Sequence, residues 1–166
     1  MRVRNFFAAL VLSASAAGAC AQEVGKTAPA FDLPGAPKAV RLADLKGRVV
    51  YVDFWASWCA PCKQSFPWMN EMQAKYGPRG LSIVGVTVDK KREDAEKFLA
   101  STPAQFLVGF DTTGKVAETY KPAGMPTSFL IGADGKVRAV HVGFRDKDKA
   151  DLEREIEAAL TAAGRK

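Results

Sequence analysis

A run at residues 48–55 that is apolar apart from Arg48 and Asp53 is followed closely by the sequence Cys59-Ala60-Pro61-Cys62, and this junction constrains the fold more than any other part of the chain. The run is rich in valine and aromatic residues, which predicts a central strand covered on both faces. Pro61 follows where the first turn of a helix is expected, a position at which its missing N–H costs nothing. The junction therefore predicts a buried strand, a turn carrying two cysteines, and a helix.

The segments that follow repeat this order of elements. Apolar residues recur at helical spacing in residues 60–75, with Pro67 as an expected kink. Residues 81–88 predict a second buried strand, and residues 92–100 predict a second helix. Strands that alternate with helices are typical of a parallel sheet.

Shorter elements complete the predicted fold. They are an N-terminal hairpin at residues 30–33 and 39–42, a strand at 106–110, a short helix at 115–120, two antiparallel strands at 127–131 and 136–142, and a closing helix with Asp146 or Asp148 as N-cap. No internal repeat or low-complexity segment is apparent in the sequence. We therefore expect one α/β domain, with a mixed central sheet flanked by helices.

The first 21 residues have the pattern of a secretory signal peptide, in which Arg2 and Arg4 precede an apolar segment and then small residues. The apolar segment is shorter than the roughly 20 residues that a transmembrane helix needs. Cleavage after Ala21 would remove Cys20, whereas a lipoprotein signal would make Cys20 the lipidated first residue. We expect a signal peptide at 1–21 and a folded domain at 22–166, with a lipid anchor through Cys20 as the alternative.

The composition excludes some partners. The formal net charge is +6, and no run of lysine and arginine with interleaved aromatic residues occurs, so a nucleic-acid surface is not supported. The charge is that of an ordinary soluble protein, although an anionic membrane face or an acidic partner stays open.

Three chemical roles for Cys59 and Cys62 compete with catalysis. A structural disulfide between them would close a loop too small to restrict the unfolded chain much. A zinc site needs four ligands, and after removal of the leader only these cysteines and His141 remain. A copper site needs fewer soft ligands and stays open.

The fourth role, dithiol–disulfide exchange, is favoured by the expected position of Cys59 at the N-terminus of a helix. Unpaired N–H groups and the helix dipole stabilise a thiolate there. We therefore expect an accessible Cys59 sulfur to be the attacking group. Cys62 lies one turn into the helix, where fewer N–H groups are free, and is expected to be the resolving cysteine.

Several motifs share order and spacing with the thioredoxin superfamily. The sequence FWASWCAPCK resembles its active site, Pro67 its kink proline, GMPTSFLI its cis-proline strand, and DGKVRAVHVGF its final hairpin. The leader, the N-terminal hairpin and an insertion between residues 90 and 120 make the chain similar to the TlpA/ResA-like branch of exported thioredoxins. The resemblance implies a thioredoxin-like fold.

The same resemblance implies roles for particular residues. The peptide bond before Pro126 should be cis, and Trp58, Met125 and Pro126 should contact the substrate beside Cys59. Asp53 should lie beneath Cys62 and help to move its proton.

The chain departs from the family pattern at one position near this acid. Burial should raise the pKa of Asp53, as it does for any carboxyl group taken out of water. The lysine that thioredoxins place opposite this acid is here Gly85. We expect Trp55, Trp68 and His141 to have structural or surface roles.

The predicted function is that of an exported thiol-disulfide oxidoreductase, without a cofactor, that reduces client proteins. The resemblance implies cysteine-containing clients, such as apocytochrome c or copper-site assembly proteins, and a membrane thiol electron donor. One alternative is a peroxiredoxin-like peroxidase, although the expected Pro-x-x-x-Thr/Ser-x-x-Cys pattern is absent. The other is a copper-binding assembly protein that uses the same cysteines. The residues Ala60 and Pro61 do not determine whether the protein acts as reductant or oxidant.

Overall fold

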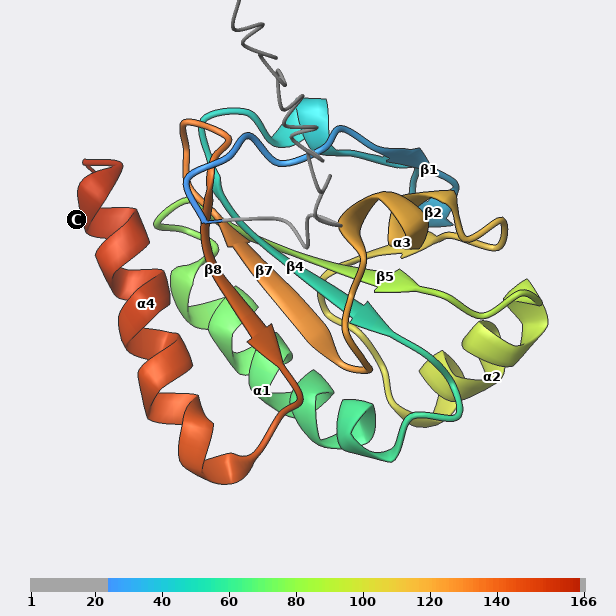
Figure 1. Ribbon diagram of the computed structural model, residues 1–166. Coiled ribbons are helices and arrows are strands. Elements are labelled where there is room, and N and C mark those ends of the chain that lie inside the picture. The colour runs from blue at the N-terminus through green and yellow to red at the C-terminus, as the bar shows by residue number, and fades with distance from the viewer. Residues whose placement is uncertain (1–23, 165–166) are drawn as a thin grey trace, which may run out of the picture.

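The computed structural model describes residues 24–164, which form a six-stranded mixed sheet flanked by helices (Figure 1). The strand order is β2-β6-β5-β4-β7-β8, and a separate two-stranded sheet pairs β1 with β3. In chain order the elements are β1 (Asp32–Leu33), β2 (Gly35–Ala36), β3 (Val40–Arg41), β4 (Val49–Trp55), α1 (Ala60–Tyr76), β5 (Leu81–Thr87), α2 (Arg92–Ser101), β6 (Leu107–Phe110), α3 (Lys115–Tyr120), β7 (Thr127–Ile131), β8 (Val137–Val142) and α4 (Lys149–Ala162). The predicted α/β fold is confirmed.

Two apolar clusters hold the sheet between its covering layers. One cluster joins the sheet to α1, α2 and α4, and the other joins the opposite face to α3 and the N-terminal segment. Figure 1 shows α4 running beside β8, at the edge of the sheet. Every residue of β4 is buried, as expected for a strand covered on both faces. Tyr51, Asp53 and Trp55 alternate with their neighbours and point to the face that α1, α2 and α4 cover.

Most predicted elements lie within a residue or two of their expected bounds. The N-terminal hairpin is present as the pairing of β1 with β3, but β2, which pairs with β6, was not predicted. Helix α1 continues through Pro67 to Tyr76. Asp148 occupies the N-cap position of α4, but its side chain makes no capping hydrogen bond and instead accepts hydrogen bonds from Arg145.

The expected signal peptide and Cys20 lie outside the described residues. Among residues 24–164, no helix combines the length and apolar character required to cross a membrane.

Candidate active site

The end of β4 and the start of α1 place the two cysteines one helical turn apart. Cys59 is the N-cap residue of α1, with extended backbone angles, and Pro61 lies in the first turn. The Cys62 N–H donates a hydrogen bond to Cys59 Sγ over 3.3 Å. The sulfur of Cys59 therefore lies among the free N–H groups of the helix, as the sequence predicts.

Cys59 and Cys62 form a disulfide, so this structure is the oxidised state. Cys62 is fully buried, and Cys59 is 4% exposed. The prediction of an accessible Cys59 sulfur is therefore too strong for the disulfide form, because the pair packs into the apolar cluster beneath α1. What exposure remains is on Cys59.

Asp89 fixes the loop that leads to Cys59, and the sequence analysis did not single it out. Its buried carboxylate accepts hydrogen bonds from the Ser57 N–H at 2.9 Å, from Ser57 Oγ at 2.9 Å and from Thr87 Oγ1 at 2.8 Å. The loop between β4 and α1 is thereby tied to the end of β5. A polar residue directly after the second buried strand was the available sequence signal.

The peptide bond between Met125 and Pro126 is cis, as the family resemblance implied. The Gly143 N–H donates to the Pro126 carbonyl oxygen over 2.7 Å, which ties this turn to the end of β8. Met125 is partly buried against the cluster that contains both cysteines. The cis-proline turn thus packs against the same apolar cluster as the two cysteines.

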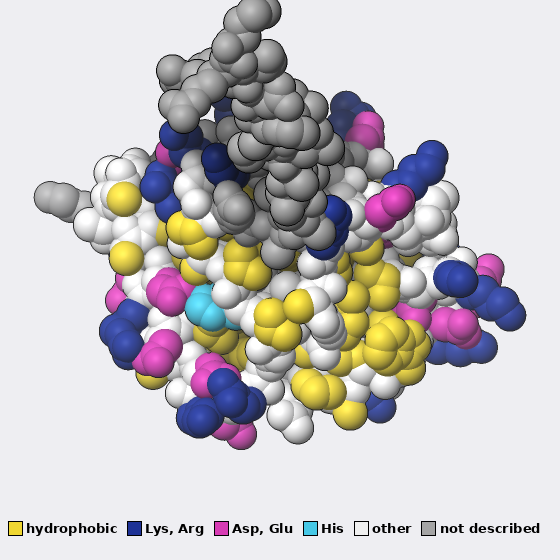
Figure 2. All heavy atoms as spheres, viewed as in Figure 1, with side chains coloured by type: hydrophobic (Ala, Val, Ile, Leu, Met, Phe, Trp, Pro, Cys, Tyr) yellow, Lys and Arg dark blue, Asp and Glu magenta, His cyan; other side chains and the backbone are white. Residues whose placement is uncertain are grey.

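Exposed apolar side chains surround this site. Trp58 is 72% exposed and Val142 is 60% exposed, values that are unusual for large apolar residues. Figure 2 shows apolar side chains gathered where the start of β7 and the start of α1 lie in Figure 1. Exposed apolar side chains that gather in one place are a common feature of surfaces that bind other molecules.

Asp53 is buried near the centre of the sheet, and its Oδ2 has no hydrogen-bond partner among the described residues. Burial raises the pKa of this carboxyl group well above its ordinary value, as predicted. Gly85 lies directly opposite Asp53 on β5, so the side chain that thioredoxins place there is missing. Trp55 and Trp68 are buried and pack against aromatic neighbours, which agrees with their expected structural role.

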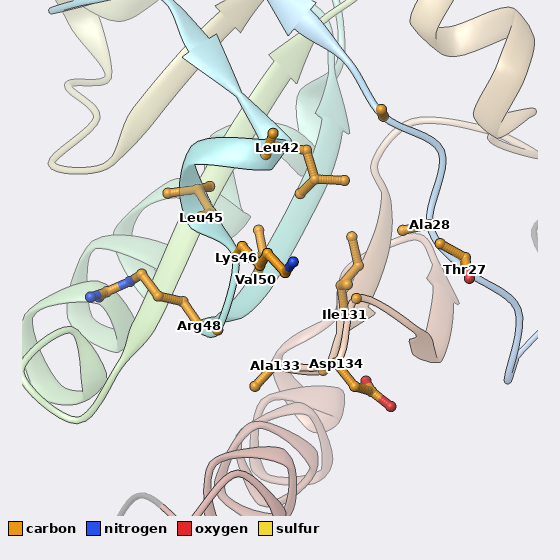
Figure 3. Close-up of a pocket in the computed structure, with 15 residues that line it drawn as sticks. Thr27, Ala28, Leu42, Leu45, Lys46, Arg48, Val50, Ile131, Ala133 and Asp134 are labelled. Carbon is orange, nitrogen blue, oxygen red and sulfur yellow. The ribbon is translucent and has the colours of Figure 1, made fainter.

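Metal ligands and a second cavity are the remaining features that bear on a possible site. Within residues 24–164, no three histidine, cysteine or acidic side chains cluster as metal ligands would. A cavity of about 300 Å³ lies at the opposite end of β4, where Leu42, Leu45, Val50 and Ile131 contribute apolar side chains (Figure 3). Because Val50 is the second residue of β4 whereas Cys59 follows the end of that strand, this cavity is remote from the cysteines.

A helix-capping cysteine bonded to a buried partner, beside a cis-proline turn on this fold, defines a thiol-disulfide oxidoreductase of the thioredoxin superfamily. The chain belongs to the Redoxin family, whose model matches residues 23–159. Within the superfamily it is a ResA/TlpA-like protein.

The individual similarities agree with this assignment. The chain is 37% identical over 132 residues to "Thiol-disulfide oxidoreductase ResA" of Bacillus cereus (strain ZK / E33L), covering 78% of this chain and 75% of that protein. It is 38% identical over 120 residues to the protein of that name from Bacillus subtilis (strain 168), covering 72% and 67%. A crystal structure from Chlorobium tepidum, described as thiol:disulfide interchange protein DsbE, is 56% identical with a TM-score of 0.81, covering 83% of this chain and 98% of that chain.

Proposed function

We propose that the protein is an exported protein-disulfide reductase in which Cys59 attacks client disulfides and Cys62 resolves the mixed disulfide. The observation that carries the proposal is the position of Cys59 Sγ at the N-terminus of α1, bonded to a cysteine that is itself fully buried. What little surface the pair exposes is on Cys59 and none is on Cys62, which supports attack by Cys59 and resolution by Cys62. The helix N-terminus stabilises the Cys59 thiolate that the first step needs.

The proposed reaction has two steps, attack by Cys59 and resolution by Cys62. The Cys59 thiolate attacks one sulfur of the client disulfide, forms a mixed disulfide, and displaces the other client sulfur as a thiolate. Asp53 then takes the proton of the Cys62 thiol, and the Cys62 sulfur bonds to Cys59 Sγ. The second client sulfur leaves with its electron pair, so the client is reduced and the protein acquires the disulfide seen here.

Trp58, Met125 and Pro126 are proposed to bind the client. The exposed Trp58 side chain provides apolar contact, and extended backbone at the cis-proline turn can pair with a client segment as a short added strand. Recognition through backbone and apolar contact suits unfolded clients with an accessible disulfide. From the family resemblance, apocytochrome c and copper-site assembly proteins are the proposed clients.

The location and the electron supply belong to the same proposal. Residues 1–21 are proposed to direct export, with cleavage after Ala21 or lipidation of Cys20 as the two processing outcomes. In an oxidising compartment a dithiol remains reduced only if a donor keeps reducing it, so we propose a membrane thiol donor. The mass of the mature protein distinguishes cleavage from lipidation.

A paired substitution tests the proposed function. Reduced protein is mixed with a disulfide-containing peptide, and the products are separated by mass under acid quench. Cys59→Ser should abolish peptide reduction, whereas Cys62→Ser should accumulate a mixed disulfide between the peptide and Cys59. The proposal is overturned if Cys59→Ser retains reduction, or if the wild-type protein reduces the peptide no faster than a small free thiol does.

A further inference from the structure

Asp53, Ser128 and His141 form a polar row from the centre of the sheet to its edge. Asp53 on β4 pairs in register with Ser128 on β7, and Ser128 pairs with His141 on β8. Strand β8 is the outermost strand on that side. Directly opposed residues of antiparallel strands point to the same face with Cβ atoms about 5 Å apart. The three side chains are therefore neighbours on the face that α1 and α4 cover.

Two more polar groups join this row. Tyr51 Oη donates a hydrogen bond to Ser128 Oγ over 2.7 Å, and both residues are buried. At the outer end, His141 Nε2 lies 2.6 Å from Glu155 Oε2 of α4. Burial, then the charge of Asp53 and, less strongly, that of Glu155 raise the pKa of the Tyr51 hydroxyl. That hydroxyl therefore interacts with the carboxyl groups at both ends of the row.

On the other side of Asp53, aromatic rings take the place of hydroxyl groups. Gly85 on β5 pairs with Asp53, and Val108 on β6 pairs with Gly85. A Cβ atom on Gly85 would lie 3.1 Å from both Trp55 Nε1 and the ring of Phe106, so these two rings occupy the space next to the glycine. The Trp55 N–H in this space can only donate a hydrogen bond, so the hydroxyl and imidazole groups that can both take up and release a proton lie on the β7 side of Asp53.

The outer end of the row reaches solvent. The side chains of His141 and Glu155 are 29% and 41% exposed, and both line a surface cavity of about 200 Å³. Figure 2 shows the single histidine of the chain at the surface beside acidic side chains. The other charged groups lining this cavity are Arg145, Asp148 and Asp151, and Arg145 donates to Asp148 over 2.7 Å. Glu155 is thus the acid in direct contact with the imidazole.

We propose that this row conducts the proton between Asp53 and solvent during exchange, with Ser128, Tyr51 and His141 as positioning residues for proton transfer. The inference rests on the proposed function, since Asp53 must act as the base for Cys62. It gives His141 a role beyond the structural or surface one expected from the sequence.

The proton path follows from the chemistry of the side chains. After Asp53 has accepted the Cys62 proton it is neutral, and it must lose that proton before it can act as a base again. In the proposed path the Ser128 side chain turns from the Tyr51 hydroxyl toward Asp53 Oδ2, which has no hydrogen-bond partner among the described residues. A hydroxyl group can accept one proton and donate another. Ser128 and Tyr51 can therefore each pass a proton along the row. The imidazole of His141 has two ring nitrogens, so it can take up a proton on one of them and release a proton from the other, beside Glu155 and the surface cavity.

A peptide with a dye on each half of its disulfide separates the two chemical steps. Release of the first half reports attack by Cys59, and release of the second half reports resolution by Cys62. We expect His141→Gln to slow the second release about tenfold at neutral pH and to leave the first within about twofold. Added imidazole should restore the second release, because it can enter the cavity beside Glu155. Ser128→Ala and Tyr51→Phe should slow the same step without imidazole rescue.

Glu153→Gln is the matched control, since it also breaks an ion pair of α4, with Lys75, away from the row. It should leave both releases unchanged. The proton path is overturned if His141→Gln resolves as fast as wild type, if its loss does not respond to imidazole, or if Glu153→Gln shows the same loss. A wild-type protein without any exchange would overturn the proposed function as well, whereas normal exchange with unaffected variants overturns the proton path alone.

Discussion

The Ser57 N–H donates a hydrogen bond to Asp89 Oδ2 over 2.9 Å, although the two residues are 32 positions apart in the chain. This contact joins the turn before Cys59 to the end of β5. Because Ser57 Oγ also donates to the Asp89 carboxylate, the turn is held at two points. The position of Cys59 at the N-terminus of α1 thus depends on a residue from the following βα unit.

Replacement of Asp89 by alanine should therefore affect both stability and cysteine reactivity. The Ser57 and Thr87 donors would lose a charged acceptor in a buried setting, which costs about 3 kcal/mol of unfolding free energy. In the reduced protein, iodoacetamide should label Cys59 more slowly at acidic pH, because a looser turn holds the thiolate less well at the helix N-terminus. Urea unfolding and timed alkylation measure the two effects.

Asp134→Ala is the control for this experiment. Its carboxylate also accepts a backbone N–H, from Lys136, but it lies in the turn between β7 and β8. Cys59 labelling should stay at the wild-type rate in that variant. The hydrogen bonds from Ser57 to Asp89 form a clamp on the turn before Cys59. Equal labelling rates for Asp89→Ala and wild type would contradict the proposed dependence of Cys59 on this clamp.

The sequence predicts those parts of the fold that depend on local pattern. The apolar run that forms β4, the helical spacing of α1 and the turn between β7 and β8 are all recognisable within short windows. Strand β2 was missed because it has two residues, Gly35 and Ala36, and exists only through its pairing with β6. Helix α1 is continuous at Pro67, where the neighbouring Phe66 and Trp68 are buried, and the kink expected there stays a prediction.

The candidate site likewise has features that the sequence predicts and features that it does not. The spacing of Cys59 and Cys62 is visible in the sequence, and burial of Asp53 follows from its place in an apolar strand. The clamp by Asp89 and the row from Asp53 to His141 depend on loop geometry and on strand register. Register is set by contacts between distant segments, so a single sequence without an alignment does not provide it.

Trp58→Ala should weaken client recognition without destabilising the fold. At 72% exposure the indole contributes little to the core, so the unfolding free energy should change by less than about 0.5 kcal/mol. The rate constant for reduction of a protein client at low concentration should fall about tenfold, equivalent to about 1.4 kcal/mol of lost contact. Reaction with a small aliphatic disulfide should be unaffected.

Val24→Ala removes an apolar side chain of similar exposure, 62%, near the start of the described chain. It should change neither client nor small-disulfide kinetics. Equal losses in the Trp58 and Val24 variants, or a loss with the small disulfide as large as that with the client, would show that Trp58 does not bind the client.

Gly85→Ala should destabilise the protein, although replacement of a glycine by alanine inside a strand normally stabilises it. The added Cβ would meet Trp55 Nε1 and the Phe106 ring at 3.1 Å, which requires a core ring to move. Overpacking of this kind costs about 1–3 kcal/mol, measured here by urea unfolding. Gly124→Ala, whose Cβ would meet only Val142 at 3.9 Å, is the control and should be nearly neutral. An unchanged or raised stability of Gly85→Ala would show that the space beside Asp53 is open to a side chain.

The pH dependence of stability should reveal the buried carboxyl group of Asp53. Its pKa is raised by burial in the folded state, whereas in the unfolded chain it is about 3.9. Between these two pKa values the folded protein holds a proton that the unfolded chain has lost, so the unfolding free energy decreases as pH rises. The stabilisation is complete below about pH 3.9 and disappears as pH rises through the folded pKa, with each tenfold change in proton affinity worth about 1.4 kcal/mol.

Asp53→Asn removes this titration, so the oxidised variant should gain stability relative to oxidised wild type as pH rises above about 4. The oxidised form is used because the disulfide keeps both cysteines from titrating. Asp134→Asn provides a control of opposite sign. Although partial desolvation raises the Asp134 pKa, hydrogen bonds from the Lys136 N–H and Arg138, with the Arg138 charge, lower it overall. Its contribution is therefore lost as pH falls. Parallel stability curves for Asp53→Asn and wild type across this range would mean that Asp53 is ionised in the folded protein. The Asp53 carboxyl group would then lack the raised pKa that its burial implies.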